Sequence, residues 1–136
     1  MDKPLNNFKA ILALSGGVLG WLFGGFDSLI YALIAFVVLD YVTGVLLAIH
    51  EKKISSEIGF QGISKKVMIF ILVAVGHVID QYIIGTGSSL RTMLIMFYLS
   101  NEGISILENA GAMGIPLPQK LKDVIQQFSK NSPSKK

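Results

Sequence analysis

The distribution of lysine constrains the fold of this chain more than any other feature. Four apolar stretches cover residues 10–26, 28–49, 67–84 and 90–108. Lysines precede the first stretch, lie between the second and third, and follow the fourth, whereas the other two connections contain no lysine, and Arg91 lies at the start of the fourth stretch. Cytoplasmic loops of membrane proteins are enriched in Lys and Arg. The pattern therefore predicts four membrane-spanning helices with both termini in the cytoplasm.

The predicted fold is an all-α integral membrane protein with four transmembrane helices arranged as two antiparallel hairpins. A bilayer core requires about 20 apolar residues per helix, and the stretches approach that length. Beyond them, residues 117–128 place apolar side chains at helical spacing opposite Lys, Asp and Gln, which predicts an amphipathic helix on the membrane or against the loop Glu51–Lys66. We expect one membrane domain over residues 1–128 and a disordered basic tail over 129–136.

Composition argues against several classes of protein. Only 15% of the residues are charged, against about 25% in ordinary soluble domains. The chain has no cysteine and two separated histidines, so we expect no disulfide, no metal site and no catalytic thiol. Phosphate loops, nucleophile elbows and zinc-protease motifs are absent, so we expect no cofactor and no enzyme activity. The net charge of +3 is explained by topology, and we expect no nucleic-acid partner.

The first apolar stretch has two interpretations. Lys3 and Lys9 followed by an apolar run resemble a secretory signal peptide, but no A-x-A-like cleavage site follows. We therefore expect a retained signal-anchor. The turn signal Gly24–Asp27 predicts a tight hairpin with the second stretch.

Small residues mark candidate sites of close helix packing. Gly16 and Gly20 are four residues apart, a spacing that lets helices approach closely. The pair suits packing against the second stretch or a contact between subunits. The predicted helix-packing residues are Gly16, Gly20, Gly44, Ala48 and Gly76.

Ionisable residues inside the apolar stretches each cost about 2.5–3.5 kcal/mol on insertion scales, so each needs a reason. At a rise of about 1.5 Å per residue, Asp40, His77 and Glu102 are predicted to lie near the bilayer midplane. His77 is expected to hydrogen-bond to Asp40 or Glu102. Asp80 and Arg91 are expected near the outer face, where they can pair across the short turn between the third and fourth stretches.

Polar and small residues form one stripe on each of three predicted helices. Two interpretations stay open: the stripes hold one bundle together by buried hydrogen bonds, or they line water in a pore or between subunits. The predicted pore or interhelical network comprises Asp40, Thr43, His77, Asp80, Arg91, Tyr98, Glu102, Ser105 and Asn109.

Five segments in order give the chain a specific resemblance. Over roughly residues 36–128 it resembles phage holins of the toxin-secretion and phage-lysis type. The segments that carry this resemblance are Asp40–Gly44, Lys53–Ser56, Gly59–Lys66 with Asp80 closing the third stretch, Glu102–Asn109, and Ile115–Pro118 after Gly114. Residues of the predicted cytoplasmic loop belong to it: Ser56, Gly59, Gly62, Lys65 and Lys66.

The resemblance implies a small protein of the bacterial cytoplasmic membrane, encoded by a phage or prophage. Its expected partners are the lipid bilayer, further copies of itself, an antiholin, and an endolysin or signal-less toxin as passing cargo. Such proteins oligomerise and open lesions that lead to lysis. Members are often described with fewer than four spans, which would make the first hairpin re-entrant or interfacial. Lysine placement favours four.

Two other functions remain open from the sequence. A four-span proton-coupled transporter or ion channel could use Asp40 or Glu102 as a membrane-embedded carboxylate. An accessory membrane protein could anchor a partner through the loop Glu51–Lys66 or the C-terminal helix. Release of a large cytosolic protein on expression would favour the holin, and tolerance to a cationic compound would favour the transporter.

Overall fold

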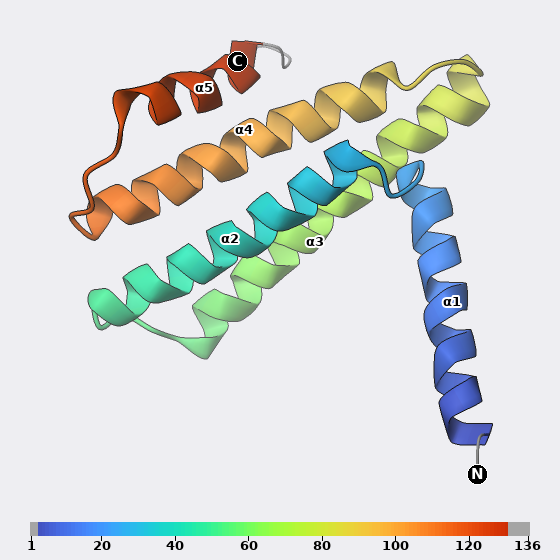
Figure 1. Ribbon diagram of the computed structural model, residues 1–136, viewed down its shortest axis with the longest axis horizontal. Coiled ribbons are helices and arrows are strands. Elements are labelled where there is room, and N and C mark those ends of the chain that lie inside the picture. Colours follow the sequence, from blue (N-terminus) through green and yellow to red (C-terminus); the bar gives the residue numbers. More distant parts are fainter. Residues whose placement is uncertain (1–2, 131–136) are drawn as a thin grey trace.

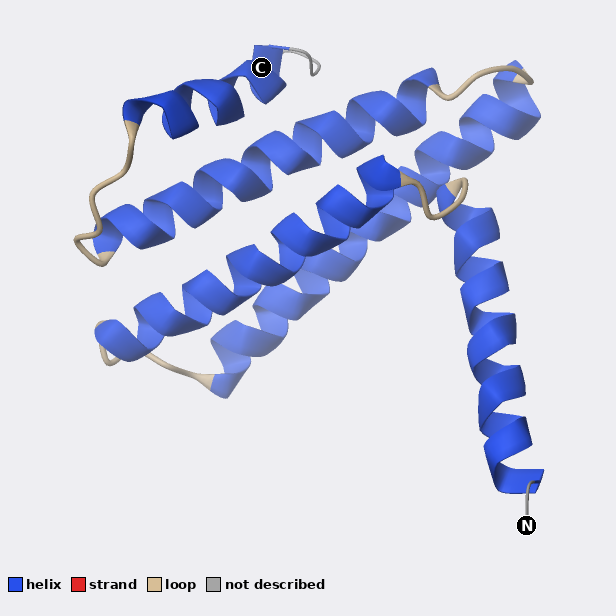
Figure 2. Cartoon of the chain, in the orientation of Figure 1, coloured by secondary structure: helices blue, strands red, loops and turns tan. Residues whose placement is uncertain are grey.

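The computed structural model describes residues 3–130, with side chains for residues 3–127. All regular structure in that part is helical, as Figure 2 shows, so the predicted all-α class is confirmed. The helices are α1 (Lys3–Phe23), α2 (Ser28–His50), α3 (Ser56–Val78), which continues as the π-helical turn η1 (Ile79–Ile84), α4 (Ser89–Ala112) and α5 (Gln119–Lys130).

The core is a three-helix bundle in which α4 packs against both α2 and α3 (Figure 1). Each of these helices contributes branched apolar side chains at helical spacing, and these side chains meet in one cluster. Its buried members are Ile30, Leu33 and Val37 from α2, Ile69 and Val73 from α3, and Ile95 and Leu99 from α4. This cluster, which we call the apolar core, separates two polar layers.

Two helices of the described chain are long and apolar enough to cross a bilayer. They are α2 and the continuous helix Ser56–Ile84, and large apolar side chains cover the outer surface of both. A surface of this kind is expected where lipid is the solvent. The predicted ends of the second stretch agree with α2 to within one residue, whereas four spans remain a prediction.

The predicted hairpin of the first two stretches is wrong. Figure 1 shows α1 leaving the bundle at a wide angle to α2, and nothing lies within 4 Å of a Cβ placed at Gly16. The last turn of α1 instead meets α3 and η1, through Phe23 against Phe70 and Trp21 against Tyr82. No hydrophobic force draws helices together in lipid, so an apolar face alone does not close a hairpin.

The predicted loop Glu51–Lys66 is mostly helix. Ser55 caps α3, because its side chain accepts a hydrogen bond from the Ile58 backbone N–H at 3.5 Å. Consequently, the five residues assigned to the cytoplasmic loop lie on α3: Ser56, Gly59, Gly62, Lys65 and Lys66. Glycine lowers helix propensity by only about 1 kcal/mol, which a cap and tertiary contacts can offset.

The predicted C-terminal amphipathic helix forms; its predicted position against the loop is wrong, whereas its position on the membrane stays a prediction. It begins at Gln119 and lies along α4, not against the α2–α3 loop (Figure 1). Ile125 is its buried residue, and a Cβ placed at Gly103 of α4 would lie 3.1 Å from Ile125 Cγ2. The absent side chain at Gly103 thus makes room for α5. The predicted disordered tail began at Ser129, but α5 includes Ser129 and Lys130; residues 131–136 lie outside the described part.

Candidate functional site

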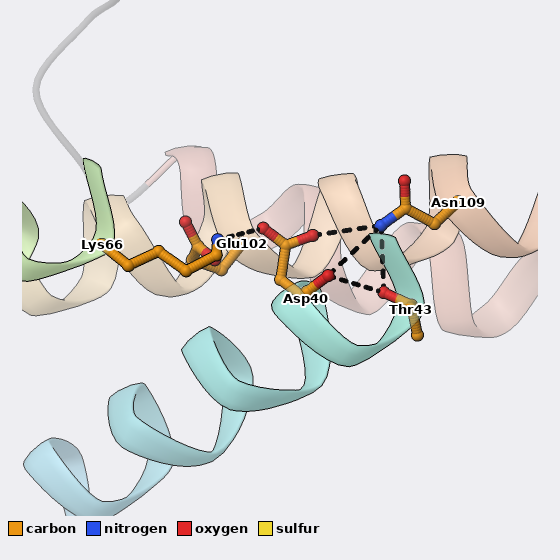
Figure 3. Close-up of polar contacts among 5 residues, drawn as sticks. All are labelled: Asp40, Thr43, Lys66, Glu102 and Asn109. Atoms are coloured by element: carbon orange, nitrogen blue, oxygen red, sulfur yellow. Dashed lines mark hydrogen bonds and ion pairs between the residues drawn. The ribbon is translucent and has the colours of Figure 1, made fainter. Parts of the chain in front are cut away.

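An ion cluster joins the three helices of the bundle (Figure 3). Lys66 of α3 donates to Asp40 Oδ2 of α2 at 2.6 Å and to Glu102 Oε2 of α4 at 2.7 Å. The side chains of Asp40 and Glu102 are only 9% and 10% exposed, and that of Lys66 is 17% exposed. One cation therefore serves two carboxylates from two different helices.

Two neutral side chains extend the cluster. Asn109 Nδ2 donates to Asp40 Oδ1 at 3.2 Å and to Thr43 Oγ1 at 3.0 Å, and Thr43 Oγ1 donates to the Asp40 backbone oxygen at 3.0 Å. These bonds connect α2 and α4 without Lys66 (Figure 3). Asp40 thus accepts hydrogen bonds from Lys66 and Asn109 and also faces Ser105, whereas Glu102 accepts from Lys66 and faces the Asp40 carboxylate.

All three charged residues lie at one level of the bundle. Asp40, Lys66 and Glu102 are each ten residues from the helix end nearest the α2–α3 loop, which corresponds to about 15 Å. Breaking a buried ion pair by removing one partner typically costs about 3–5 kcal/mol, because it leaves an uncompensated charge. The cluster therefore makes the packing of α2, α3 and α4 depend on one another.

A crevice leads from the α2–α3 loop to the cluster. Its volume is about 260 Å³, and it lies between α2, the first turns of α3 and the end of α4. Lys53 and Ser55 line one end, and Asp40 and Lys66 line the other. The predicted packing residues Gly44 and Ala48 line its wall, as do Gly62 and Ser105. Gly44 therefore borders a space, with Asn109 Nδ2 at 3.8 Å from a Cβ placed there.

The second polar layer lies at the opposite end of the bundle and is centred on Arg91. Its guanidinium donates to both carboxylate oxygens of Asp27, at 2.8 and 3.0 Å, and to the backbone oxygens of Phe23 and Gly25. The sequence predicted an Arg91–Asp80 ion pair, and this is wrong. Asp80 instead accepts from the backbone N–H groups of Leu90 and Arg91, at 3.1 and 2.9 Å, and so caps α4 from a neighbouring helix.

Asp27 has two functions in this layer. It is the N-cap of α2, since its Oδ1 accepts from the Ile30 backbone N–H at 3.0 Å. The hydrogen bond from Arg91 holds the pKa of Asp27 below its ordinary value. The turn before it needs glycine, because Gly24 has φ +79° and a Cβ there would lie 2.6 Å from His77 Nδ1.

The predicted hydrogen bond from His77 to Asp40 or Glu102 does not form among the described residues. His77 lies beside Gly24, in the layer of Arg91. The apolar stretch predicts a helix start at Val67, but α3 begins eleven residues earlier, at Ser56, and this shifts the level of His77 in the bundle. The same shift brings Lys66, which was assigned to the loop, to the level of Asp40.

The remaining predicted residues have packing roles. Tyr98 is half-buried against the apolar core, with its ring 5.0 Å from that of Phe97. At Gly76, α3 approaches α4 closely, because a Cβ there would lie 2.5 Å from Leu94 Cδ1. A Cβ at Gly20 would meet only the Phe26 ring, at 3.3 Å.

The sequence prediction did not include Lys66 and Asp27 as ion-pair partners. Ser55 as a possible helix cap was the signal that could have placed Lys66 inside a helix.

Comparison with known proteins identifies relatives over almost the whole chain. A Clostridium perfringens protein described as an uncharacterized 14.9 kDa protein in the nagH 3′ region is 37% identical, over 95% of this chain and 98% of its own. An uncharacterized protein of Listeria innocua is 47% identical over 86% of this chain and 83% of its own. No solved structure matches. The profile of the bacteriophage holin family matches residues 17–130, and the chain belongs to that family.

Proposed function

We propose that this protein is the holin of a phage or prophage, and that its copies assemble in the cytoplasmic membrane into lesions that release an endolysin or a signal-less toxin. Both termini then lie in the cytoplasm, on the side of the lysine-rich α2–α3 connection. Family membership supports a holin-like role in general. Beyond that general role, we propose the assembly, the lesions and the cargo.

The observation that supports it most is the ion cluster of Asp40, Lys66 and Glu102. Charged groups inside a membrane bundle are costly, and they persist where they pair with each other or face water. Here they pair across three helices of one chain. If subunits assemble and water enters between the helices, the same groups can be hydrated in the lesion. A bundle held by such a cluster can therefore exist in a closed and an open form.

The exposed apolar surface of α1 supports assembly of many copies. None of its 21 residues is buried, and large apolar side chains such as Phe8, Leu14 and Trp21 are more than half exposed. Three packed helices are too small to enclose a passage for a folded hydrolase. A wide lesion thus needs many chains, and the apolar helix α1, which packs on the bundle only through its last turn, provides contact surface in lipid.

The proposal is tested by inducing the chain in bacteria that also produce a cytosolic peptidoglycan hydrolase without a signal peptide. We expect an abrupt stop of growth, release of the hydrolase and lysis, with higher oligomers on crosslinking of membranes. The matched control is the hydrolase induced alone. A chain that reaches the membrane but stays monomeric or dimeric and never releases the hydrolase would contradict the proposal.

One observation favours a small transporter or channel as the second candidate. The crevice reaches the membrane-embedded carboxylate of Asp40 from one end of the bundle, as a proton-coupled carrier requires. The apolar core closes the other end within the described bundle. Passage of ions or cationic drugs by a dimer, without release of the hydrolase, would favour this candidate.

A further inference from the structure

The ion cluster is one positive charge short of neutrality. Asp40 and Glu102 together bring two negative charges, and Lys66 brings one positive charge. The neighbouring partners Thr43, Ser105 and Asn109 are neutral, and no ion pair joins the charged side chains of α5 to the cluster within residues 3–127. An uncompensated charge at this depth of a membrane bundle is costly. The cluster is therefore suited to take up one further cation.

The crevice gives water a route to the cluster. A water molecule occupies about 30 Å³ in the liquid, so a cavity of about 260 Å³ has room for several, and polar side chains such as Ser105 and Asn109 in its lining can hydrogen-bond to them. Lys53 and Ser55 are at its mouth, and Lys66 and Asp40 are at its floor. Tyr41 also lines it, with its hydroxyl 3.2 Å from a Cβ placed at Gly59.

Access from the opposite end is closed by the apolar core. Val37, Ile69 and Leu99 each lie three residues from a member of the ion cluster, toward the layer of Arg91, and all three are buried. Further along, the residues Leu33, Val73 and Ile95 are 0% exposed. A dry layer of this thickness separates the cluster from the Arg91 layer. Along the bundle axis, water therefore reaches the cluster only from the end nearest the α2–α3 loop within the described bundle.

We propose that the crevice is a cytoplasm-facing, hydrated access route through which the cluster binds one proton, with Glu102 as the group that holds it. The assignment to Glu102 follows from its hydrogen bonds, since Asp40 also accepts from Asn109, whereas Glu102 accepts from Lys66 and faces the Asp40 carboxylate, which can accept a hydrogen bond from a protonated Glu102. The inference rests on the proposed membrane function for its orientation, because lysine placement sets which side is cytoplasmic.

The proton transfer balances in a single relay. Lys66 passes one of its protons to Glu102 Oε2, 2.7 Å away, and takes one from a hydronium ion in the crevice, which becomes water. The ammonium of Lys66 is restored, Glu102 is neutral, and the net charge of the cluster rises from −1 to zero. Uptake of the proton thereby couples the packing of α2, α3 and α4 to cytoplasmic pH.

Single cysteines test the access route, since the chain has no cysteine of its own. Gly44 lines the crevice and has room for a side chain, whereas Leu46 is exposed on the outer surface of α2 and lies closer to the loop. In inside-out membrane vesicles, a small charged thiol reagent is expected to label Gly44→Cys and to leave Leu46→Cys unlabelled. In right-side-out vesicles neither should react. Labelling of Leu46→Cys in preference to Gly44→Cys would show that only distance from the membrane surface decides the reaction, and this would overturn the route. Labelling of Gly44→Cys from the outer side would also overturn it.

Infrared difference spectroscopy on the purified protein in liposomes tests the proton. We expect a protonated-carboxyl band that titrates with pH, is absent in Glu102→Gln and persists in Glu108→Gln, whose residue lies exposed on the same helix. A band lost when sodium replaces potassium at constant pH would assign the site to a metal cation and overturn the proposal, as would a band that survives Glu102→Gln. Both readouts are independent of lesions, so failure to release a hydrolase would contradict only the proposed function.

Discussion

At the scale of single residues, two cations organise the molecule. Lys66 joins Asp40 to Glu102 in one layer, and Arg91 joins Asp27 to the turn after α1 in the other. Only Arg91 was recognised from the sequence as lying near a helix end, and its partner was assigned wrongly. Arg91 presents several donors in a fixed fork, so it can satisfy a carboxylate and two backbone oxygens at once.

Arg91→Ala is predicted to lower the free energy of unfolding by less than the about 3–5 kcal/mol typical of a fully buried pair, because the Asp27 side chain is 47% exposed and stays hydrated. Arg91→Lys should fall between wild type and Arg91→Ala, since one ammonium cannot reproduce the bidentate contact. Thermal unfolding in detergent measures both. Equal stability of the three proteins would contradict the role given to Arg91.

The Asp27–Arg91 pair also has a defined pH dependence. The pKa of Asp27 is lowered by its hydrogen bond to Arg91, so the pair stabilises the fold above the ordinary pKa of about 3.9. This contribution is lost as pH falls through the lower pKa of the folded state. The stability difference between wild type and Asp27→Asn should therefore be constant near neutral pH and shrink only in acid.

At the scale of helices, α2 was predicted almost to the residue, whereas α1 and α3 were not. The ends of α2 follow from a continuous apolar run bounded by Asp27 and the lysine-rich turn. The start of α3 was missed because Ser, Gly and Lys usually indicate a loop, and here they line a crevice on a helix. The direction of α1 depends on contacts of Arg91 with Phe23 and Gly25, which no local pattern reports.

Gly16→Leu with Gly20→Leu is predicted to leave the bundle intact and to reduce self-association. Nothing lies within 4 Å of a Cβ at Gly16, and a Cβ at Gly20 meets only the Phe26 ring, at 3.3 Å, so the added bulk does not touch the three-helix bundle, but it would block close approach of a second helix. We expect normal membrane insertion and loss of higher oligomers on crosslinking. As a control, Leu14→Ala changes a side chain that is 74% exposed on the same helix without adding bulk. Unchanged oligomers in the double variant would exclude this face of α1 from the contact.

At the scale of the whole molecule, the bundle consists of two polar layers separated by an apolar core. The sequence predicted helical stripes that carry Asp40, Thr43, Glu102 and Asn109, and the structure brings these four residues together. It predicted His77 in the same group because the depth count began at the wrong residue. Three-dimensional placement of Lys66 was needed to recognise the cluster. Our central claim is that this cluster holds the closed bundle together.

The measurement that tests the claim most directly is the onset of lysis for Lys66→Met compared with the triple variant Asp40→Asn, Lys66→Met, Glu102→Gln. Lys66→Met leaves two carboxylates without their cation, at a typical cost of about 3–5 kcal/mol for a broken buried pair. The triple variant removes all three charges, so it leaves no uncompensated charge in the bundle. At equal membrane levels, we predict earlier lysis for Lys66→Met and no earlier lysis for the triple variant. Lysis of Lys66→Met on the wild-type schedule would contradict the account.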